Sequence, residues 1–417
     1  GNIGIGTSNG VGLYEVQGSY GAQTPYNGTI GFLNSPANPQ LRWEKTNTKE
    51  IGADFGLLNN RLNGTISYYT RITDDKLASV QLPTSSGLAS IRTNNGSMRN
   101  RGVEVDATYK IIQQKNFTWQ VGANAAWNKN TILKLPYNGN ENNRQGGLQV
   151  YNPQTGKVAW VGGFQEGQEW GELFGFVSDG IIRDAKDLAD YNKIDLAAGQ
   201  VWQNGAAGRN LASQTLITQK GLVNFWSTQL GDMKWKDIDN NDTIDYRDRV
   251  SLGRTLPRVT GGFNTMATWK GISLFIRLDF AVGHVQQDFQ QLWSLASAQG
   301  DFNATDAVKD TWTPANPNAK YPRYTRGDQN VSKNFDRPSD MFYVNSSYLA
   351  FREVSLRYAV PASIIRKAKM SGLTFTVTGQ NLGYITNSLL NLPERTGAQN
   401  AAYIIPTQLI FGANVSF

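Results

Sequence analysis

Apolar and polar residues alternate with a period of two along most of the hydrophobic segments of this chain. The last nine residues show the pattern well, with Ile410 as their one exception. Their apolar set is Leu409, Phe411, Ala413, Val415 and Phe417, and the set of opposite parity is Gly412, Asn414 and Ser416. Successive side chains of a strand point to opposite faces, so the alternation predicts a strand with one apolar face.

The same alternation predicts four hairpins elsewhere in the chain. The paired segments are 43–57 with 62–69, 103–110 with 117–127, 263–269 with 272–280, and 349–360 with 373–377. Short polar turns separate the two strands of the first three pairs, as is typical of tight hairpins. A Gly-rich segment around 11–20 alternates poorly and is a strand only by its context. With the last segment, the chain is expected to contain ten strands.

The composition bears on whether these strands pack around a water-soluble core or span a membrane. Mean hydropathy is −0.43, and no apolar run approaches the roughly 20 residues that a transmembrane helix requires. A barrel needs only every second residue to face lipid, so it is compatible with this low hydropathy. Glu104 and Asp106 fall on the polar face, which would be the watery lumen of a barrel. We therefore predict an all-β, transmembrane antiparallel β-barrel.

The lengths of the connections predict the orientation of this barrel. Short turns are expected at 58–61, 113–116, 270–271 and 361–370, and long connections at 79–97, 136–257, 285–342 and 384–403. Outer-membrane barrels place short turns in the periplasm and long loops outside, and they characteristically end in a strand that closes on Phe. The chain is therefore expected in the outer membrane of a Gram-negative bacterium, with Phe417 periplasmic and the loops at 136–257 and 285–342 extracellular.

Several function classes lack support in the residues. The chain has no cysteine, which removes disulfides, thiolate metal sites and thiol nucleophiles. The net charge of +7 comes from scattered residues, with one tight cluster at Arg366, Lys367 and Lys369, so we expect no nucleic-acid partner. His284 is the only histidine, and no nucleophile-elbow motif accompanies it. We predict a histidine of the rim or a loop, and no enzymatic activity.

An acidic stretch at 237–248 is the candidate metal site. Oxygen-bearing residues occupy positions one, three, five, seven, nine and twelve of a twelve-residue loop: Asp237, Asp239, Asn241, Thr243, Asp245 and Asp248. With Ile244 at the eighth position, this spacing suits a structural Ca²⁺ ion, to which Thr243 would give its backbone carbonyl. Asp242 replaces the usual Gly at the sixth position, and the twelfth residue is Asp instead of Glu. A solvated acidic turn remains the alternative, and no catalytic cofactor is expected.

Four tryptophans in the long connections are candidates for stacking on sugar rings, although packing within the loops is the alternative for each. They are Trp170, Trp226, Trp293 and Trp312. Two short helices are also expected there, at 185–191 and 287–298. These residues do not identify a substrate-binding site.

Six segments resemble the barrel of SusC/RagA-family TonB-dependent transporters. They are NPQLRWEKT at 38–46, IGADFGLLNNRL at 51–62, NRGVEV at 100–105, LFGFVSDGI at 173–181, GDMKWKD at 231–237 and VTGQNL at 377–382. They occur in the family's order and span nearly the whole chain. The resemblance implies that residues 1–417 are the carboxyl-terminal portion of a 22-stranded barrel.

The resemblance also implies partners and a function. The amino-terminal barrel portion and the plug of such a transporter would come from another chain or from another part of the same polypeptide. The expected function is import of oligosaccharides or peptides delivered by a SusD-like lipoprotein, energised by the TonB complex through the plug and embedded in outer-membrane lipid. A stand-alone ten-strand barrel acting as an adhesin or structural surface protein is the alternative.

Overall fold

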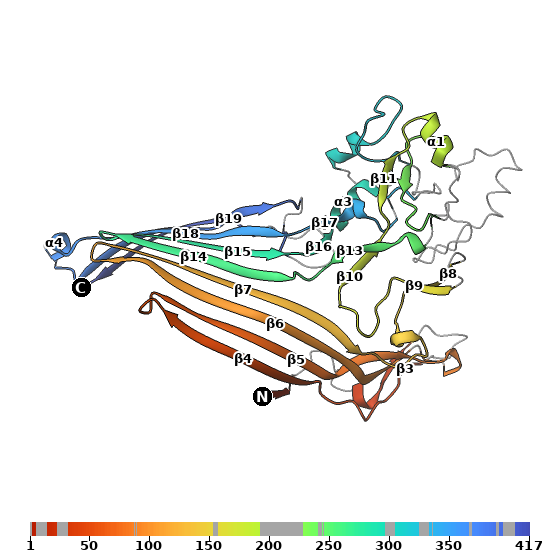
Figure 1. Cartoon of the computed structure of the whole chain (residues 1–417), viewed down its shortest axis with the longest axis horizontal. Helices are drawn as coiled ribbons and strands as arrows, with labels where there is room; N and C mark the ends of the chain where they lie inside the picture. Colours follow the sequence, from red (N-terminus) through yellow and green to blue (C-terminus); the bar gives the residue numbers. More distant parts are fainter. Residues whose placement is uncertain are drawn as a thin grey trace, which may run out of the picture.

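A ten-stranded antiparallel sheet forms the wall of the molecule, in the order β1-β4-β5-β6-β7-β14-β15-β18-β19-β20 (Figure 1). The computed structural model describes residues 2–5, 15–22, 32–86, 88, 90–152, 157–191, 228–240, 244, 246–296, 305–324, 333–335, 337–366, 369–388, 392–394 and 405–417. The wall strands are β1 (Asn2–Ile5), β4 (Lys45–Leu57), β5 (Leu62–Gln81), β6 (Ser90–Gln114), β7 (Phe117–Lys134), β14 (Val259–Trp269), β15 (Ile272–Val282), β18 (Tyr348–Ala359), β19 (Gly372–Thr386) and β20 (Gln408–Ser416). From β4 onward, strands that follow one another in the wall pair as neighbours.

The two faces of the wall differ as the alternation predicts. One cross-strand row is apolar and consists of Ile51, Tyr68, Val103, Trp127, Val259 and Val282. A second row begins at Asp54, three residues after Ile51 on β4, and lies on the other face. It consists of Asp54, Thr65, Asp106, Asn124, Gly262 and Asp279. Large apolar side chains of the first face are exposed, with Ile51 at 74%. In a barrel this apolar face meets lipid and the polar face lines the lumen.

Tight turns join the wall strands at one end, where the carboxyl terminus also lies (Figure 1). Between β14 and β15 the turn consists of Lys270 and Gly271, both with positive φ (44° and 90°), as a two-residue hairpin turn of this kind requires. The turn between β4 and β5 has Asn59 and Asn60 in the left-handed region, which asparagine tolerates better than most residues. The turns predicted at 58–61 and 270–271 are confirmed.

Two sequence-based expectations about the wall are wrong. The segment around 11–20 is no wall strand where it is described, because 15–17 form a 3-10 turn and β2 (Ser19–Ala22) pairs with β3 (Phe32–Ser35) in a separate sheet. The first wall strand is instead β1. The connection expected at 79–97 is largely hairpin, because β5 and β6 remain paired as far as Gln81 and Ser90. Polar residues in this extension hide the alternation that marks the rest of each strand.

The other end of the wall carries a layer of connecting segments, which we call the loop layer (Figure 1). Its strands are β8 (Leu148–Asn152), β9 (Lys157–Val161), β10 (Glu172–Gly175), β11 (Ser178–Ile181), β12 (Met233–Trp235), β13 (Val250–Arg254), β16 (Val285–Gln287) and β17 (Tyr343–Asn345), which pair two by two. Its helices are α1 (Ala185–Tyr191) and α3 (Phe289–Ala296), both at predicted positions, while α4 (Ala362–Ile365) lies in a turn at the opposite end. Short 3-10 helices elsewhere are Glu15–Gln17, Thr84–Ser86, Glu141–Asn143, Tyr246–Asp248, Asp306–Asp310 and Asp340–Phe342.

The loop layer has hydrophobic cores of its own. One consists of Phe176, Ile181, Ile182, Tyr191, Met233, Trp235 and Ile244, and a second of Leu295, Tyr321, Phe335 and Phe342. Among the described residues, no helix has the length and apolar character needed to cross a membrane.

Candidate functional site

The acidic stretch brings three carboxylates together in the loop layer. Asp237, Asp239 and Asp248 each present one carboxylate oxygen, and these oxygens lie within 4.8 Å of one another. Asp248 is fully buried, and its Oδ1 accepts a hydrogen bond of 2.8 Å from the backbone N–H of Ile238. Arg247 lies close by, with its Nε 3.6 Å from Asp239 Oδ2. Carboxylate oxygens in such a group match the hard-ligand preference of Ca²⁺. Asn241, Thr243 and Asp245 lie outside the described residues.

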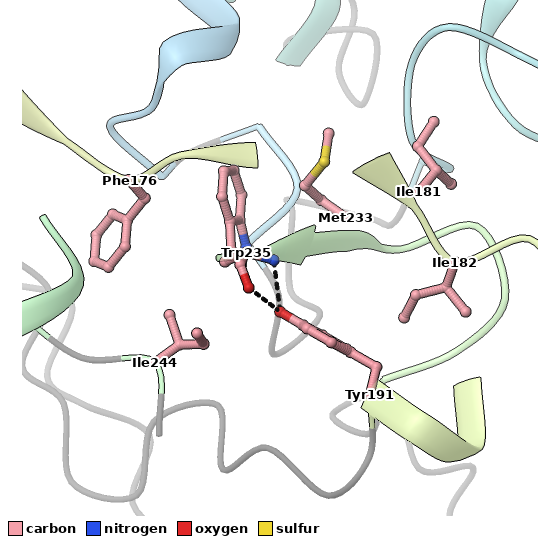
Figure 2. Packing of buried hydrophobic residues seen from close by; sticks show 7 residues of the cluster. All are labelled: Phe176, Ile181, Ile182, Tyr191, Met233, Trp235 and Ile244. Atoms are coloured by element: carbon pink, nitrogen blue, oxygen red, sulfur yellow. Dashed lines mark hydrogen bonds between the residues drawn. The ribbon is translucent and has the colours of Figure 1, made fainter. Parts of the chain in front are cut away.

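Ile244 fixes this loop to the first hydrophobic core. It is fully buried and packs with Phe176, Trp235 and Tyr191 (Figure 2). Tyr191 Oη accepts a hydrogen bond of 2.6 Å from Trp235 N–H and donates one of 3.4 Å to the Trp235 carbonyl. Burial raises the pKa of the Tyr191 phenol well above its ordinary value, so the hydroxyl keeps the proton that it donates. Ile244, the apolar eighth residue of the acidic loop, therefore holds the loop against the first hydrophobic core.

A buried charge network lies beside the first hydrophobic core. Arg323 binds Asp232 with two hydrogen bonds of 2.6 and 3.2 Å, and Asn334 Nδ2 donates to Asp232 Oδ1 at 3.1 Å. Asp232 is fully buried, so these partners replace the water that it loses. Arg337, at 1% exposure, lies over the rings of Phe176 and Trp235 at 4.7 and 5.3 Å. Paired charges and cation–π contacts thus tie together segments that are distant in sequence.

A pocket of about 390 Å³ lies where the loop layer meets the wall. The larger side chains that line it include Phe164, Gln168, Trp170, Glu172, Arg249 and Tyr343. Trp170 is 46% exposed and meets Phe164 edge to face at 5.0 Å between ring centroids. Gln168 Nε2 donates to Glu172 at 3.0 Å, while its buried Oε1 has no partner among the described residues. The exposed aromatic surface of Trp170 suits a ligand that carries a ring face.

This pocket, which we call the mouth pocket, is fixed to the end of the wall by Glu169 and Trp170. The Trp170 N–H donates to Asn130 Oδ1 at 2.6 Å. Glu169 is ion-paired with Lys129 at 3.3 Å, with Arg258 at 3.0 Å and with Arg254. Burial opposes the charge of Glu169, but its hydrogen bonds to Arg254 and Lys129 outweigh burial and hold the pKa of the carboxyl below its ordinary value. Glu169 therefore remains charged.

The other candidate side chains have structural surroundings. Trp312 is partly buried and lies directly against Gly231, so packing describes it better than ligand stacking. Trp226 lies outside the described residues, and Trp293 belongs to α3. His284 is 2% exposed, and because a carbonyl only accepts, its Nε2–H donates to the Pro393 carbonyl at 2.9 Å. His284 joins the wall end to segment 392–394, as a histidine at the rim would.

Sequence reasoning identified Trp170 but missed the mouth pocket. The pocket combines residues 162–174 with Arg249 and Tyr343, which no local pattern connects. At its edge, Gly171 has a φ of 89°, a backbone conformation that favours glycine.

Comparison with known proteins supports the architecture from three sides. The family model "TonB dependent receptor-like, beta-barrel" matches residues 6–215. TonB-dependent receptor P39 of Formosa agariphila is 25% identical over 427 residues, covering 98% of this chain and 39% of the relative. TonB-dependent receptor SusC of Bacteroides thetaiotaomicron is 43% identical over 126 residues, covering 30% of this chain and 12% of the relative.

A solved structure with the same fold is that of the RagAB peptide transporter. The TM-score is 0.68 at 22% identity, over 98% of this chain and 39% of that chain. This chain thus spans about two-fifths of the length of such relatives. The predicted resemblance and the predicted antiparallel barrel fold are confirmed, and because the family model covers half of its residues, the chain belongs to the β-barrel family of TonB-dependent receptors of the outer membrane.

Proposed function

We propose that this chain is the carboxyl-terminal barrel portion of a SusC-like nutrient importer. The observation that carries the proposal is the wall of ten antiparallel strands with a lumen-facing polar surface, capped at one end by a built loop layer. Relatives named as TonB-dependent receptors, SusC among them, support it. In this reading the tight turns and Phe417 are periplasmic and the loop layer is extracellular.

The edges of the wall support a larger barrel. Among the described residues, β20 pairs only with β19, and β1 covers just Lys45–Thr48 of β4. Unpaired N–H and C=O groups along these edges would be costly in hydrocarbon, so further strands are needed to close the barrel. We assign them, with the plug and its contact to the TonB complex, to another part of the polypeptide or to a second chain. A 22-stranded barrel would be the result.

The proposed substrates are oligosaccharides or peptides delivered by a SusD-like lipoprotein. The mouth pocket supports a contact with substrate, because it offers an exposed Trp170, the carboxylate of Glu172 and the guanidinium of Arg249 beside the lumen end of the wall. Aromatic faces with a few polar groups are typical of small-ligand sites of about 300–1,000 Å³. The segments of the loop layer within 136–257 and 285–342 would also contact the lipoprotein.

We also propose that the acidic loop holds a structural Ca²⁺ ion. The close approach of the carboxylates of Asp237, Asp239 and Asp248 supports this, as does the burial of Ile244. The ion would fix the loop upon the first hydrophobic core and would take no part in chemistry. No enzymatic activity is proposed, because the family consists of receptors and His284 is a buried structural residue.

Native mass spectrometry of the protein extracted from membranes in mild detergent tests the importer, with peptide mapping of everything that stays bound. We expect this chain together with an amino-terminal barrel-and-plug portion and a lid-like lipoprotein. A folded, heat-modifiable species that runs alone near 46 kDa would instead support the alternative, a complete ten-strand barrel that acts as an adhesin or structural surface protein.

A further inference from the structure

Four basic side chains lie on the outer face of β4, β6 and β7, in two adjacent cross-strand rows. One row consists of Lys49, Thr70, Arg101 and Lys129, and the next of Asn47, Ile72, Arg99 and Thr131. These residues have the parity of the apolar row that contains Tyr68 and Trp127, so they share its face. Neighbouring strands are about 4.8 Å apart, which makes the four charges one patch. We call Lys49, Arg99, Arg101 and Lys129 the basic patch.

The register places the basic patch at the boundary of the apolar band. β14 spans Val259–Trp269, 11 residues, which agrees with the roughly 9–11 that a tilted strand needs to cross a bilayer. Val259 belongs to the row of Ile51, Tyr68 and Trp127 at the loop-layer end of that span. The row of Lys49 and Arg101 lies two residues farther out on β4 and β6. This is the level at which lipid headgroups begin.

Among the residues that the structure describes, only one of the four cations of the basic patch has an ion-pair partner. Lys129 is paired with Glu169. Lys49, Arg99 and Arg101 form no hydrogen bond or ion pair with any described residue, and the Nε atoms of both arginines are buried without an acceptor. The terminal nitrogens of the two guanidinium groups, which are not among the buried atoms, can still donate to an anionic acceptor.

Besides Glu169, two carboxylates among the described residues lie near the basic patch: Glu50, which lines the same pocket as Lys49, and Asp74. Asp74 stands one row beyond Arg99, opposite Lys45, and its Oδ1 accepts a hydrogen bond of 2.7 Å from Ser97 Oγ. Pairing of a further strand with the edge of β4 would use backbone groups and leave the outward Lys49 side chain uncovered. Neither carboxylate forms an ion pair with Lys49, Arg99 or Arg101, so these three side chains keep their charge available on the face that has the parity of the apolar row.

We propose that the basic patch binds the phosphorylated headgroup of a glycolipid in the outer leaflet. Arginine presents a planar fork that matches phosphate oxygens, and lysine adds a point charge, so the three free cations can share one or two phosphates. The apolar and aromatic row directly below, with Tyr68 and Trp127, lies where the acyl chains of the same lipid begin. The assignment to the outer leaflet rests on the orientation proposed above. Lipid binding by the basic patch does not depend on whether the protein transports a nutrient.

The test is lipid binding by the complete protein purified in mild detergent. Bisphosphorylated lipid A is titrated against the wild type, against K49Q/R99Q/R101Q and against the matched variant K115Q/K186Q/R366Q, with native mass spectrometry as the readout. The matched variant loses the same charge at exposed positions outside the basic patch. Loss of three membrane-surface cations should weaken lipid A binding roughly 100-fold, while the matched variant should stay within about threefold.

Four further measurements keep the outcome unambiguous. Heat-modifiable migration on gels confirms that each variant is folded. R99K/R101K, which retains the charge, should keep binding within about tenfold of the wild type. Equal losses in the two triple variants would overturn the proposal, as would competition by inorganic phosphate at concentrations comparable to the lipid, or equally tight binding of phosphatidylglycerol. None of these results depends on whether the protein imports a nutrient.

Discussion

The wall and the loop layer of this protein bury their apolar residues in opposite ways. In the wall, large apolar side chains such as Ile51 and Phe411 are exposed, at 74% and 72%, and the polar residues face inward. In the loop layer, the side chains of Phe176, Trp235 and Leu295 are at most 1% exposed. The wall thus relies on lipid as its apolar phase, while the loop layer carries its own core as a water-soluble domain does.

Residues in the two regions are therefore suited to different surroundings, lipid for the wall and water for the loop layer. Wall residues satisfy a local rule, because the two faces alternate along each strand. Loop-layer residues satisfy a packing rule, in which Trp235 of β12 meets Tyr191 of α1 and Ile244 of the acidic loop. Damage to one region should therefore leave the other largely intact.

The largest expected effect is in the loop layer. Trp235→Ala would remove a 1%-exposed indole from the first core and should destabilise the loop layer by about 3–5 kcal/mol. Limited proteolysis followed by peptide mapping should show new cleavage near 176–191 and 233–248, with the wall strands still protected and the barrel still heat-modifiable. As the matched control, Trp269→Ala on the outer face of the wall should leave loop-layer cleavage unchanged. Loss of the barrel in W235A would show that the two regions are not independent.

The next effect sharpens the comparison within one strand of the wall. Ile66 is on the apolar face beside Val105, and Thr65 is on the polar face between Asp54 and Asp106. Ile66→Arg should cost up to about 2–4 kcal/mol, because a charge within the apolar band is placed in lipid. Thr65→Arg should be tolerated, because it adds a cation between two carboxylates. Folding titrations into lipid vesicles measure both, and equal costs would show that the assignment of the faces is wrong.

The wall was largely predictable from the sequence, for a local reason. Alternation in segments such as 103–110 and 409–417 marks which residues share a face, and turn chemistry at Lys270–Gly271 fixes the hairpin register. Prediction failed where alternation fails, at the extensions of β5 and β6 beyond the apolar band. The wrong first strand, around 11–20, has the same origin, because its glycines and isolated apolar residues give no period.

The candidate sites were predictable only in part. The acidic loop is contiguous, so its spacing alone indicated that Asp237, Asp239 and Asp248 would converge. The mouth pocket and the basic patch depend on register between strands and on contacts across more than 70 residues, such as that between Glu169 and Arg254. Single-sequence periodicity contains no information of that kind, although Lys49, Arg99 and Arg101 already had the parity of the apolar face.

Calcium should stabilise the loop layer and leave the wall unchanged. At a free Ca²⁺ concentration of about 100 times its Kd, the proposed site would add about 2.7 kcal/mol to the stability of the segment around 237–248. Hydrogen exchange with and without a chelator measures this, with peptides of β14 and β15 as the internal reference. Asp239→Asn should raise the Ca²⁺ concentration needed for this protection at least about tenfold, because the substitution removes a carboxylate charge. Asp306→Asn, at an exposed site outside the acidic loop, should not, and unchanged protection on chelation would contradict a bound ion.

The smallest effect concerns the junction between the two regions, at Glu169. Its pKa is held below the ordinary value of 4.5, so its ion pairs stabilise the mouth pocket fully above that value and are lost as pH falls through the lower, folded-state pKa. Because Lys129 and Arg258 still reach water, we expect a contribution of about 1 kcal/mol. The fluorine resonance of 5-fluorotryptophan at Trp170, assigned with W170F, should therefore hold its position from pH 7 to about 5 and move only below.

Glu169→Gln should place this resonance near its acid position at every pH, since the amide keeps the size of the side chain but loses the charge that binds three cations. Glu141→Gln, an exposed carboxylate of the same loop layer, should retain the wild-type profile. A wild-type resonance that moved between pH 7 and 5 would mean that the pKa of Glu169 is raised, and burial would then outweigh its basic partners. In that case burial within the loop layer would dominate the energetics of Glu169. A transition that occurs only in acid would show instead that the ion pairs to the basic residues at the end of the wall dominate.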